Sequence, residues 1–508
     1  MIAQRAGRLR PIAKTAKGRD VKMKPHNGRL ARWFGPSRRA VCNGLPAVVA
    51  ALLLGAGAWA AQPQPGGGAP ARRPPLAPAW WDLVRPRNAK ERQAVAAIKA
   101  TGALPTAGKD GELLQLAVTG QPGLGDTFGD EHMAMLPDLP SLEWVGVESQ
   151  RVSNAGLAYL ARLPRLRSVS LKGAQFDARG LAQLRALPRL TQLFLIGTGA
   201  DDSTMRIIGE MRGLQLLTIG GSPITDDGLA PLEGLKCLES LALRDTRVDD
   251  AGLAHLAGLV QLRWLAVEGE RKKGLTLAYP PFGIGDTGLR HLQRLAKLGY
   301  LSTLVGVTDE GTRYLADKTE LAQLNLRWAS ITDAGLVHLS RLNKLKELCL
   351  PGAVPPGPAY GPRITDAGLP RLAGLAGLGI LDLSGQPITD AGVRRLVPLR
   401  SLKSLYLAGT KVTDAATPAL SQMPGLEEIA LDETQITDAG LARLKPLAKL
   451  RGLGLARTRV TDRGLDYLLE LPNLDNRGLS ELNLHGTAVT EEGIQEYRKK
   501  RESLKSIP

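Results

Sequence analysis

Leucine recurs along this chain at two spacings, and the two spacings alternate. In one unit four leucines stand three residues apart, at Leu441, Leu444, Leu447 and Leu450. That spacing favours a short α- or 3₁₀-helical segment with one apolar stripe. The following segment, Leu450-x-x-Leu453-x-Leu455, places alternate side chains on one side of a short strand. The pattern therefore predicts a unit made of one short helix and one short strand.

The unit returns mostly every 24 residues, marked by Ile-Thr-Asp-Ala-Gly-Leu and its variants. The motif is complete at Ile331–Leu336, Ile364–Leu369 and Ile436–Leu441, while Thr204 and Ala416 replace its glycine in two units. A fixed period of this size is typical of a solenoid. Because no unit can bury its own leucines, the units must stack, strand beside strand, around one continuous core.

The motif also predicts how each helix begins. Thr437 and Asp438 stand where the free N–H groups of a helix start need an oxygen acceptor, and the Asp charge complements the helix dipole. Gly440 indicates either a close approach of neighbouring coils or a constrained backbone.

These repeats resemble those of leucine-rich-repeat proteins of the ribonuclease-inhibitor-like type, and most of all exported bacterial proteins built on T-D-A-G-L repeats. The resemblance covers about residues 88–508. It implies an α/β leucine-rich-repeat solenoid: a curved horseshoe with a parallel sheet inside and short helices outside. The family often has Asn after the strand, where this chain has Thr246, Thr410, Thr434, Thr458 and Thr487. The resemblance says little about function, because the scaffold serves many partners.

The repeats divide the chain into five expected segments. Residues 1–61 form a basic leader, 62–86 a Pro/Gly-rich linker, and 87–126 an N-terminal cap. Leucine-rich repeats fill 127–490, and 491–508 form a C-terminal cap. Within the first cap we expect an amphipathic helix over Arg87–Thr101 and a first strand at Leu113–Val118.

The leader changes the interpretation of the net charge. Residues 1–44 hold twelve Lys or Arg and one acid, so the chain's charge of +17 falls to about +6 without residues 1–61. Most of the basic excess is therefore no sign of nucleic-acid binding. The apolar run 45–60 ends in Ala58-Trp59-Ala60, which is typical of an export-signal cleavage site. An uncleaved membrane anchor is the alternative, and Met23 is an alternative start.

Candidate chemistry is sparse. His255, His291 and His338 all stand three residues after the motif glycine, where other units carry Tyr or Arg, so we expect an outward helix face and no metal site. Three cysteines, Cys42, Cys237 and Cys349, are too few for a disulfide framework. No Ser-His-Asp or Cys-His grouping recurs. The sequence therefore predicts no enzyme, cofactor or metal.

The inner face of the sheet is the candidate binding surface. In Leu-x-x-Leu-x-Leu-x-x the third, fifth and seventh positions point away from the core, and the eighth lies at the rim. Aromatic and Arg side chains there are candidate anchors for a partner. They are Trp144 and Trp264 (third), Phe194 and Tyr406 (fifth), Arg244 and Arg327 (seventh) and Trp328 (eighth). The alternative is that the aromatic rings shield the sheet.

Two insertions are expected to leave the sheet on the same side, where its strands end. They lie near 268–285 and 351–363, follow the strand of their unit, and carry Tyr279 and Tyr360. Insertions on one side of a solenoid often lie at its binding side. Tolerated loop growth is the alternative, since a longer loop costs little stability.

We therefore expect an exported, non-enzymatic repeat protein that binds a protein, or a glycan, in the cell envelope or outside the cell. Membrane contact is expected only through residues 45–60, if the leader is not cleaved. The alternatives are a membrane-anchored structural component of the envelope and a substrate adaptor resembling ubiquitin-ligase repeat proteins.

Overall fold

In the computed structural model, residues 77–508 form one compact unit. The structure describes residues 80–118, 127–269, 284–302, 304–350, 364–474 and 482–505. The leader, most of the linker and nearly all of both insertions lie outside these ranges. Among the described residues, no helix is long and apolar enough to cross a membrane. The five segment boundaries remain predictions.

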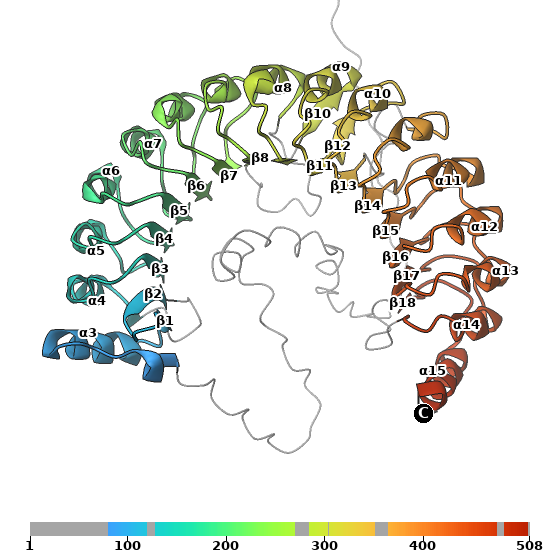
Figure 1. Cartoon of the computed structure of the whole chain (residues 1–508), viewed down its shortest axis with the longest axis horizontal. Coiled ribbons are helices and arrows are strands. Elements are labelled where there is room, and N and C mark those ends of the chain that lie inside the picture. The colour runs from blue at the N-terminus through green and yellow to red at the C-terminus, as the bar shows by residue number, and fades with distance from the viewer. Residues whose placement is uncertain are drawn as a thin grey trace, which may run out of the picture. The chain divides into compact units, whose positions relative to one another are not determined.

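The inner strands follow the concave side of an arc, and the helices follow its outer side (Figure 1). They form one sheet of 16 described strands, in which every neighbouring pair except β1 and β2 is parallel. The bounds are β1 (Leu104–Ala107), β2 (Leu113–Val118), β3 (Trp144–Glu148), β4 (Ser168–Lys172), β5 (Gln192–Ile196), β6 (Leu216–Gly220), β7 (Ser240–Thr246), β8 (Trp264–Gly269), β9 (Tyr300–Ser302), β11 (Gln323–Asn325), β13 (Glu347–Cys349), β14 (Ile380–Asp382), β15 (Ser404–Tyr406), β16 (Glu428–Ala430), β17 (Gly452–Gly454) and β18 (Leu482–Asn483). This arrangement confirms the predicted leucine-rich-repeat solenoid.

Short helices return the chain from the end of one strand to the start of the next. The α-helices are α3 (Ala89–Ala100), α4 (Asp130–Met133), α5 (Asn154–Leu160), α6 (Ala178–Ala182), α7 (Asp202–Gly209), α8 (Asp286–His291), α9 (Asp309–Thr312), α10 (Leu336–Leu339), α11 (Asp390–Leu396), α12 (Thr417–Leu420), α13 (Asp438–Leu441), α14 (Asp462–Leu468) and α15 (Glu491–Lys505). The 3₁₀ segments are η2 (Trp80–Leu83), η4 (Leu136–Asp138), η5 (Gln183–Ala186), η6 (Asp227–Gly234), η7 (Gly252–Leu256), η8 (Leu292–Arg294), η9 (Arg313–Leu315), η10 (Leu369–Leu372), η11 (Asp414–Ala416) and η12 (Ala442–Leu444).

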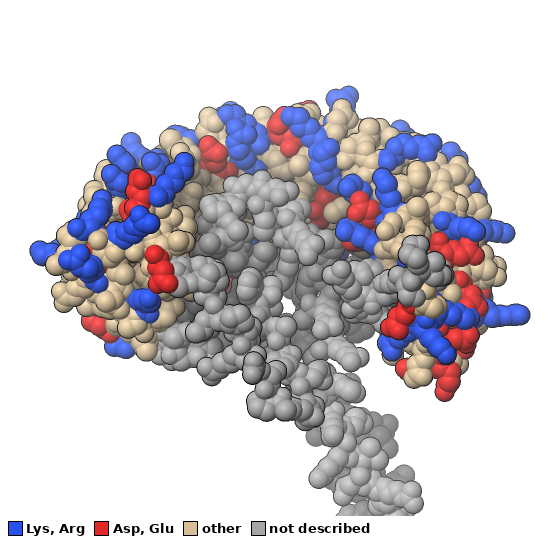
Figure 2. Space-filling view, turned by 60° about the horizontal axis from the view of Figure 1, so that its bottom comes forward, with Lys and Arg blue, Asp and Glu red and all other residues tan. Residues whose placement is uncertain are grey.

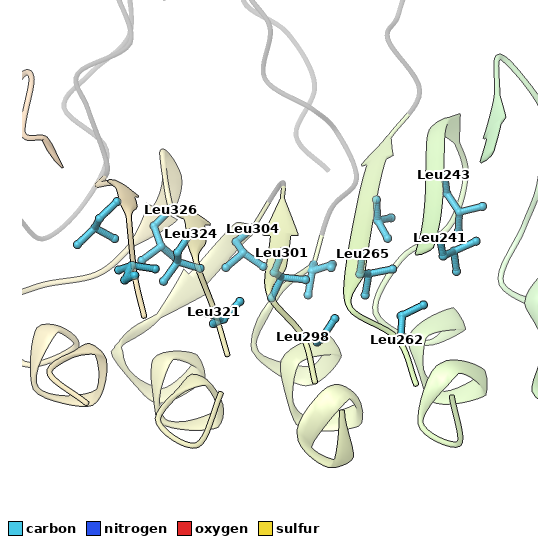
Figure 3. Close-up of a cluster of buried hydrophobic side chains, with 14 of the residues drawn as sticks. Leu241, Leu243, Leu262, Leu265, Leu298, Leu301, Leu304, Leu321, Leu324 and Leu326 are labelled. Carbon is cyan, nitrogen blue, oxygen red and sulfur yellow. The ribbon is translucent and has the colours of Figure 1, made fainter. Parts of the chain in front are cut away.

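Leucines of successive coils lie side by side between the sheet and the helices (Figure 3). Leu241, Leu265 and Leu301, from three neighbouring coils, are at most 1% exposed. Full burial of a leucine contributes about 1.5–3 kcal/mol relative to exposure. The core is therefore a continuous row of leucines, as the period predicts.

In the repeated motif the Thr caps the helix, whereas the carboxylate of the Asp, expected as a second acceptor at the helix start, bonds to the next coil. Thr437 Oγ1 accepts the N–H of Ala439 and so caps α13, while Asp438 accepts two hydrogen bonds from the next coil. Its Oδ1 lies 2.8 Å from the Thr461 nitrogen, and its Oδ2 lies 2.7 Å from Thr461 Oγ1. The same pair recurs from coil to coil, for example between Asp414 and Thr437. We call this row of Asp residues, with the residues that donate to them, the carboxylate ladder.

The ladder explains the motif glycine. A Cβ atom on Gly440 would overlap Asp414 Oδ1 and lie 3.0 Å from its Cγ. Close approach of the coils, rather than a constrained backbone, thus favours glycine, although one Cβ atom is accommodated at Ala416, where the Asp390 carboxylate of the preceding coil still accepts hydrogen bonds from Thr413. Thr204 fits because Ala178 stands at the Asp position of the preceding coil, where no carboxylate occupies the space.

The ends differ from the repeats. The expected helix and strand of the N-terminal cap are present as α3 and β2, with Asn88 capping α3. The additional strand β1, which pairs antiparallel with β2, was not predicted. At the other end Arg501 of α15, only 5% exposed, donates hydrogen bonds to the carbonyls of Leu469, Leu471 and Leu474.

Candidate functional site: the inner face of the sheet

Strand register sets the rows of residues on the inner face. Trp264 lies beside Tyr300, Tyr300 beside Gln323, and Gln323 beside Glu347, so one row runs across β8, β9, β11 and β13. A second row, two residues further along each strand, contains Ala266, Asn325, Cys349, Asp382 and Tyr406.

The first row contains an aromatic pair. The rings of Trp264 and Tyr300 are stacked, with centroids 3.5 Å apart and an angle of 6° between their planes. Both side chains are half-buried, so part of each ring remains open to solvent. Stacking of this kind contributes about 0.5–1.5 kcal/mol beyond the buried area. The pair therefore holds two large rings in a fixed orientation on the sheet.

Sequence reasoning missed Tyr300. It occupies the third position of its unit, the same position as Trp264. The signal was present in Leu298-Gly-Tyr300-Leu301, but the insertion upstream breaks the 24-residue spacing from which positions were assigned. The unit is also irregular after its strand, because the next buried leucine, Leu304, stands three residues after Leu301 instead of two.

Two predicted anchors do not stand exposed. Trp144 and Phe194 are only 5% and 4% exposed. The Trp144 ring lies over Gly146, where a Cβ atom would overlap it. For these two residues the expectation of an exposed ring is wrong, and the shielding alternative describes their placement.

Trp328 is not in the row of Trp264. It begins β12 (Trp328–Ser330), which pairs in parallel with β10 (Val305–Thr308) in a separate two-stranded sheet. Trp264 starts β8, whereas Trp328 lies beyond the end of β11. The two tryptophans therefore lie at opposite ends of the inner strands and do not form one centre, although Trp328 is half-buried at the predicted rim.

Charged and polar side chains lie on the inner face from β11 to β16. Arg327 Nη2 lies 2.8 Å from Asp382 Oδ2. Glu347 accepts a hydrogen bond of 3.1 Å from Gln323, and burial raises the pKa of its carboxyl group. Burial, together with the charges of Asp382 and Glu347, raises the pKa of the Cys349 thiol to about 12. The thiol is therefore protonated at neutral pH and is a weak nucleophile.

Tyr406 is held by its neighbour on β16. Its hydroxyl donates to Glu428 Oε2 over 3.1 Å, and Ser404 donates to the same oxygen over 3.2 Å. Burial and the Glu428 charge raise the pKa of Tyr406, so the hydroxyl stays protonated as a donor. Asp432 accepts the N–H of Ala456 over 2.9 Å, and burial raises the pKa of its carboxyl group.

The remaining predicted residues are placed as follows. Arg244 is half-buried on β7, next to Glu268 in the register of β8. Tyr279 and Tyr360 lie outside the described residues. His255 lies on η7, on the outer side, with Nδ1 2.6 Å from Glu233 Oε1. In the described ranges no group of three His, Cys, Asp or Glu is placed to hold a metal ion.

No family model matches the chain, and no curated protein matches it. Solved structures that align with it are leucine-rich-repeat proteins. An internalin from Listeria monocytogenes is 19% identical, with 83% of this chain and 96% of that chain covered and a TM-score of 0.44. A leucine-rich-repeat protein of Leptospira interrogans is 16% identical, with 72% and 78% covered and a TM-score of 0.40. The plant receptor RGFR1 in complex with RGF2 is 13% identical, with 67% and 63% covered and a TM-score of 0.41. The fold assignment itself rests on the leucine core and the parallel strands.

Proposed function

We propose that this chain is an exported, non-enzymatic leucine-rich-repeat protein of the T-D-A-G-L, ribonuclease-inhibitor-like type, and that it binds a protein partner on the inner face of its sheet. The observation that carries the proposal is the Trp264–Tyr300 stack. Large, rigid aromatic side chains at a surface are the residues that most often dominate binding energy. Because each ring is already held by the other, a partner loses little side-chain entropy when it covers them.

The surroundings of the stack support a protein rather than a glycan. Each ring covers one face of the other, which leaves fewer open ring faces for a sugar to stack on. Beside the stack lie Gln323 and Glu347, and further along the sheet lies the Arg327–Asp382 ion pair. An aromatic centre with ordered donors and acceptors around it is the usual anatomy of a protein interface.

The absence of enzymatic activity is proposed on the chemistry of the same face. The Cys349 thiol has a pKa raised to about 12, and the Tyr406 hydroxyl is held as a donor to Glu428. Neither group is activated as a nucleophile or a base.

The test compares two variants in a quantitative pull-down from envelope extract. Trp264→Ala/Tyr300→Ala removes the stack, and Tyr467→Ala removes an aromatic ring that is 39% exposed on α14, on the outer side. We expect the double variant to recover the partner at least tenfold less well and Tyr467→Ala to equal the wild type. Equal recovery by all three proteins would reject the inner face as the binding surface.

Export is tested separately by sequencing the N-terminus of the mature protein. A start at Ala61 or Gln62 supports cleavage of the leader, after Ala60 or after Ala61 respectively. Recovery of the uncleaved chain in the membrane fraction would instead support the membrane-anchored alternative.

A further inference from the structure

From β2 onward the inner strands are parallel, so they all begin along one side of the sheet and end along the other, and these two sides carry different charges. The turns that lead from helix to strand lie along the side where the strands begin. The carboxylate ladder lies along the side where they end. In the twelve seven-residue turns that end immediately before β4 to β17, nineteen Lys or Arg stand against six Asp or Glu. We call this side of the sheet the basic edge. Figure 2 shows Lys and Arg side chains projecting along the outline of the repeat region, with Asp and Glu between them.

Many charges of the basic edge are exposed and have no ion-pair partner. Arg185, Lys344 and Lys445 form ion pairs with acids of neighbouring coils. Arg263, Lys403 and Arg451 likewise pair with Glu239 or Glu427. Several other exposed bases form no ion pair with another described residue. Among these are Arg165, Arg167, Arg189, Arg341, Lys346 and Lys449.

Helix dipoles do not account for this excess. A base in the last turn of a helix is favoured by the dipole, but the effect falls off within that turn. Arg165 and Arg167 lie beyond the end of α5 at Leu160, and Lys346 lies beyond the end of α10 at Leu339. These bases face solvent in the turn itself, which indicates a binding partner outside the chain.

We propose that the basic edge binds the surface of an anionic lipid bilayer. The charges extend along twelve strands, which at about 4.8 Å per strand is roughly 50 Å. They are spread along an edge instead of gathered in a groove, so an extended flat surface meets more of them than a single polymer strand does. Val260, 48% exposed, lies in the turn before β8 and adds an apolar side chain to the edge. This surface is separate from the inner face and does not depend on the proposed partner.

The test uses the full-length chain and two variants that lose equal charge. The edge variant is Arg165→Gln/Arg189→Gln/Arg341→Gln/Lys449→Gln. The control variant removes four exposed bases from the side of the carboxylate ladder, as Arg179→Gln/Lys411→Gln/Arg459→Gln/Arg463→Gln. Both retain the basic residues 1–44, so the leader contributes equally, and matching melting temperatures verify that both are folded.

Binding is measured by co-sedimentation with vesicles of phosphatidylglycerol and phosphatidylcholine at low and high salt. Each Lys or Arg near an anionic surface contributes about fivefold to binding. We therefore expect the edge variant to bind at least tenfold more weakly than the control variant, and vesicles of phosphatidylcholine alone to bind none of the proteins. Equal loss in both variants, or none in the edge variant, would overturn the proposal. So would tighter binding of duplex DNA than of anionic vesicles at the same salt, which would assign the edge to nucleic acid.

Discussion

Replacing Gly440 by Ala tests the close approach on which the stacking of coils depends. A Cβ atom there would overlap Asp414 Oδ1 and lie 3.4 Å from Ile436 Cγ2, so the carboxylate must move. Asp414 holds the next coil through hydrogen bonds to Thr437 of 2.8 Å to the nitrogen and 2.6 Å to Oγ1. Overpacking costs about 1–3 kcal/mol. Ala gains up to about 1 kcal/mol over Gly in a helix. With the full helix gain, the expected net loss in free energy of unfolding is thus about 0–2 kcal/mol.

The same substitution should be harmless once the carboxylate is removed. In an Asp414→Ala background, Gly440→Ala should stabilise the protein slightly, so the coupling between the two sites should reach about 2 kcal/mol. The natural pair Ala178 and Thr204 shows that the next coil accepts a larger side chain where no carboxylate stands. Ala416 stands opposite the intact Asp390 carboxylate and shows that a single Cβ atom can be accommodated beside one, which places the expected loss toward the lower end of its range. The assay is a double-mutant cycle in urea. Gly374→Ala is the control, because its Cβ would meet only Ser340 O at 3.8 Å. A Gly440→Ala penalty of the same size in both backgrounds would refute this explanation.

Three further outcomes follow from the structure. Burial and the neighbouring carboxyl of Asp249 raise the pKa of Asp226, which favours the protonated form in the fold and costs stability as the pH rises through that pKa. Asp249→Thr should therefore raise the melting temperature at neutral pH, with a gain that shrinks at acid pH; an equal gain at both would contradict the carboxyl pair. Arg501→Met should lose about 2–3 kcal/mol of local stability, seen as faster hydrogen exchange across 468–474, because buried carbonyls lose a charged donor. Iodoacetamide at neutral pH should modify the exposed Cys237 at least tenfold faster than Cys349, whose pKa is about 12, as peptide mass spectrometry can measure; equal rates would contradict the burial of Cys349.

The architecture follows from sequence because one constraint repeats in every unit. A 24-residue unit with leucines at helix and strand spacing has no other way to bury them than to stack in parallel. Close approach was one of the two explanations of Gly440 that the sequence allowed. What the sequence did not reveal is its cause, because the Asp414 carboxylate that fills the space belongs to the preceding coil.

The inner face was less predictable, since exposure there depends on neighbours across strands. Trp144 and Trp264 both occupy the third position of their unit, so position alone predicts the same exposure for both. Trp144, however, lies over Gly146 and is buried, whereas Trp264 stacks on Tyr300 and remains half-exposed. The strands β1 and β12 were missed for a related reason. Both lie where the chain departs from the repeat, so the period carried no information about them.

The most direct test of the proposed binding surface is site-specific photo-cross-linking in living cells. A photoreactive amino acid replaces Gln323, beside the aromatic stack, or Val337, which is 43% exposed on α10 at the outer side. We expect a discrete protein adduct from position 323 that disappears when Trp264→Ala/Tyr300→Ala is added, and none from position 337. An adduct that forms from position 337 alone, or one at 323 that survives loss of the stack, would contradict binding at the inner face.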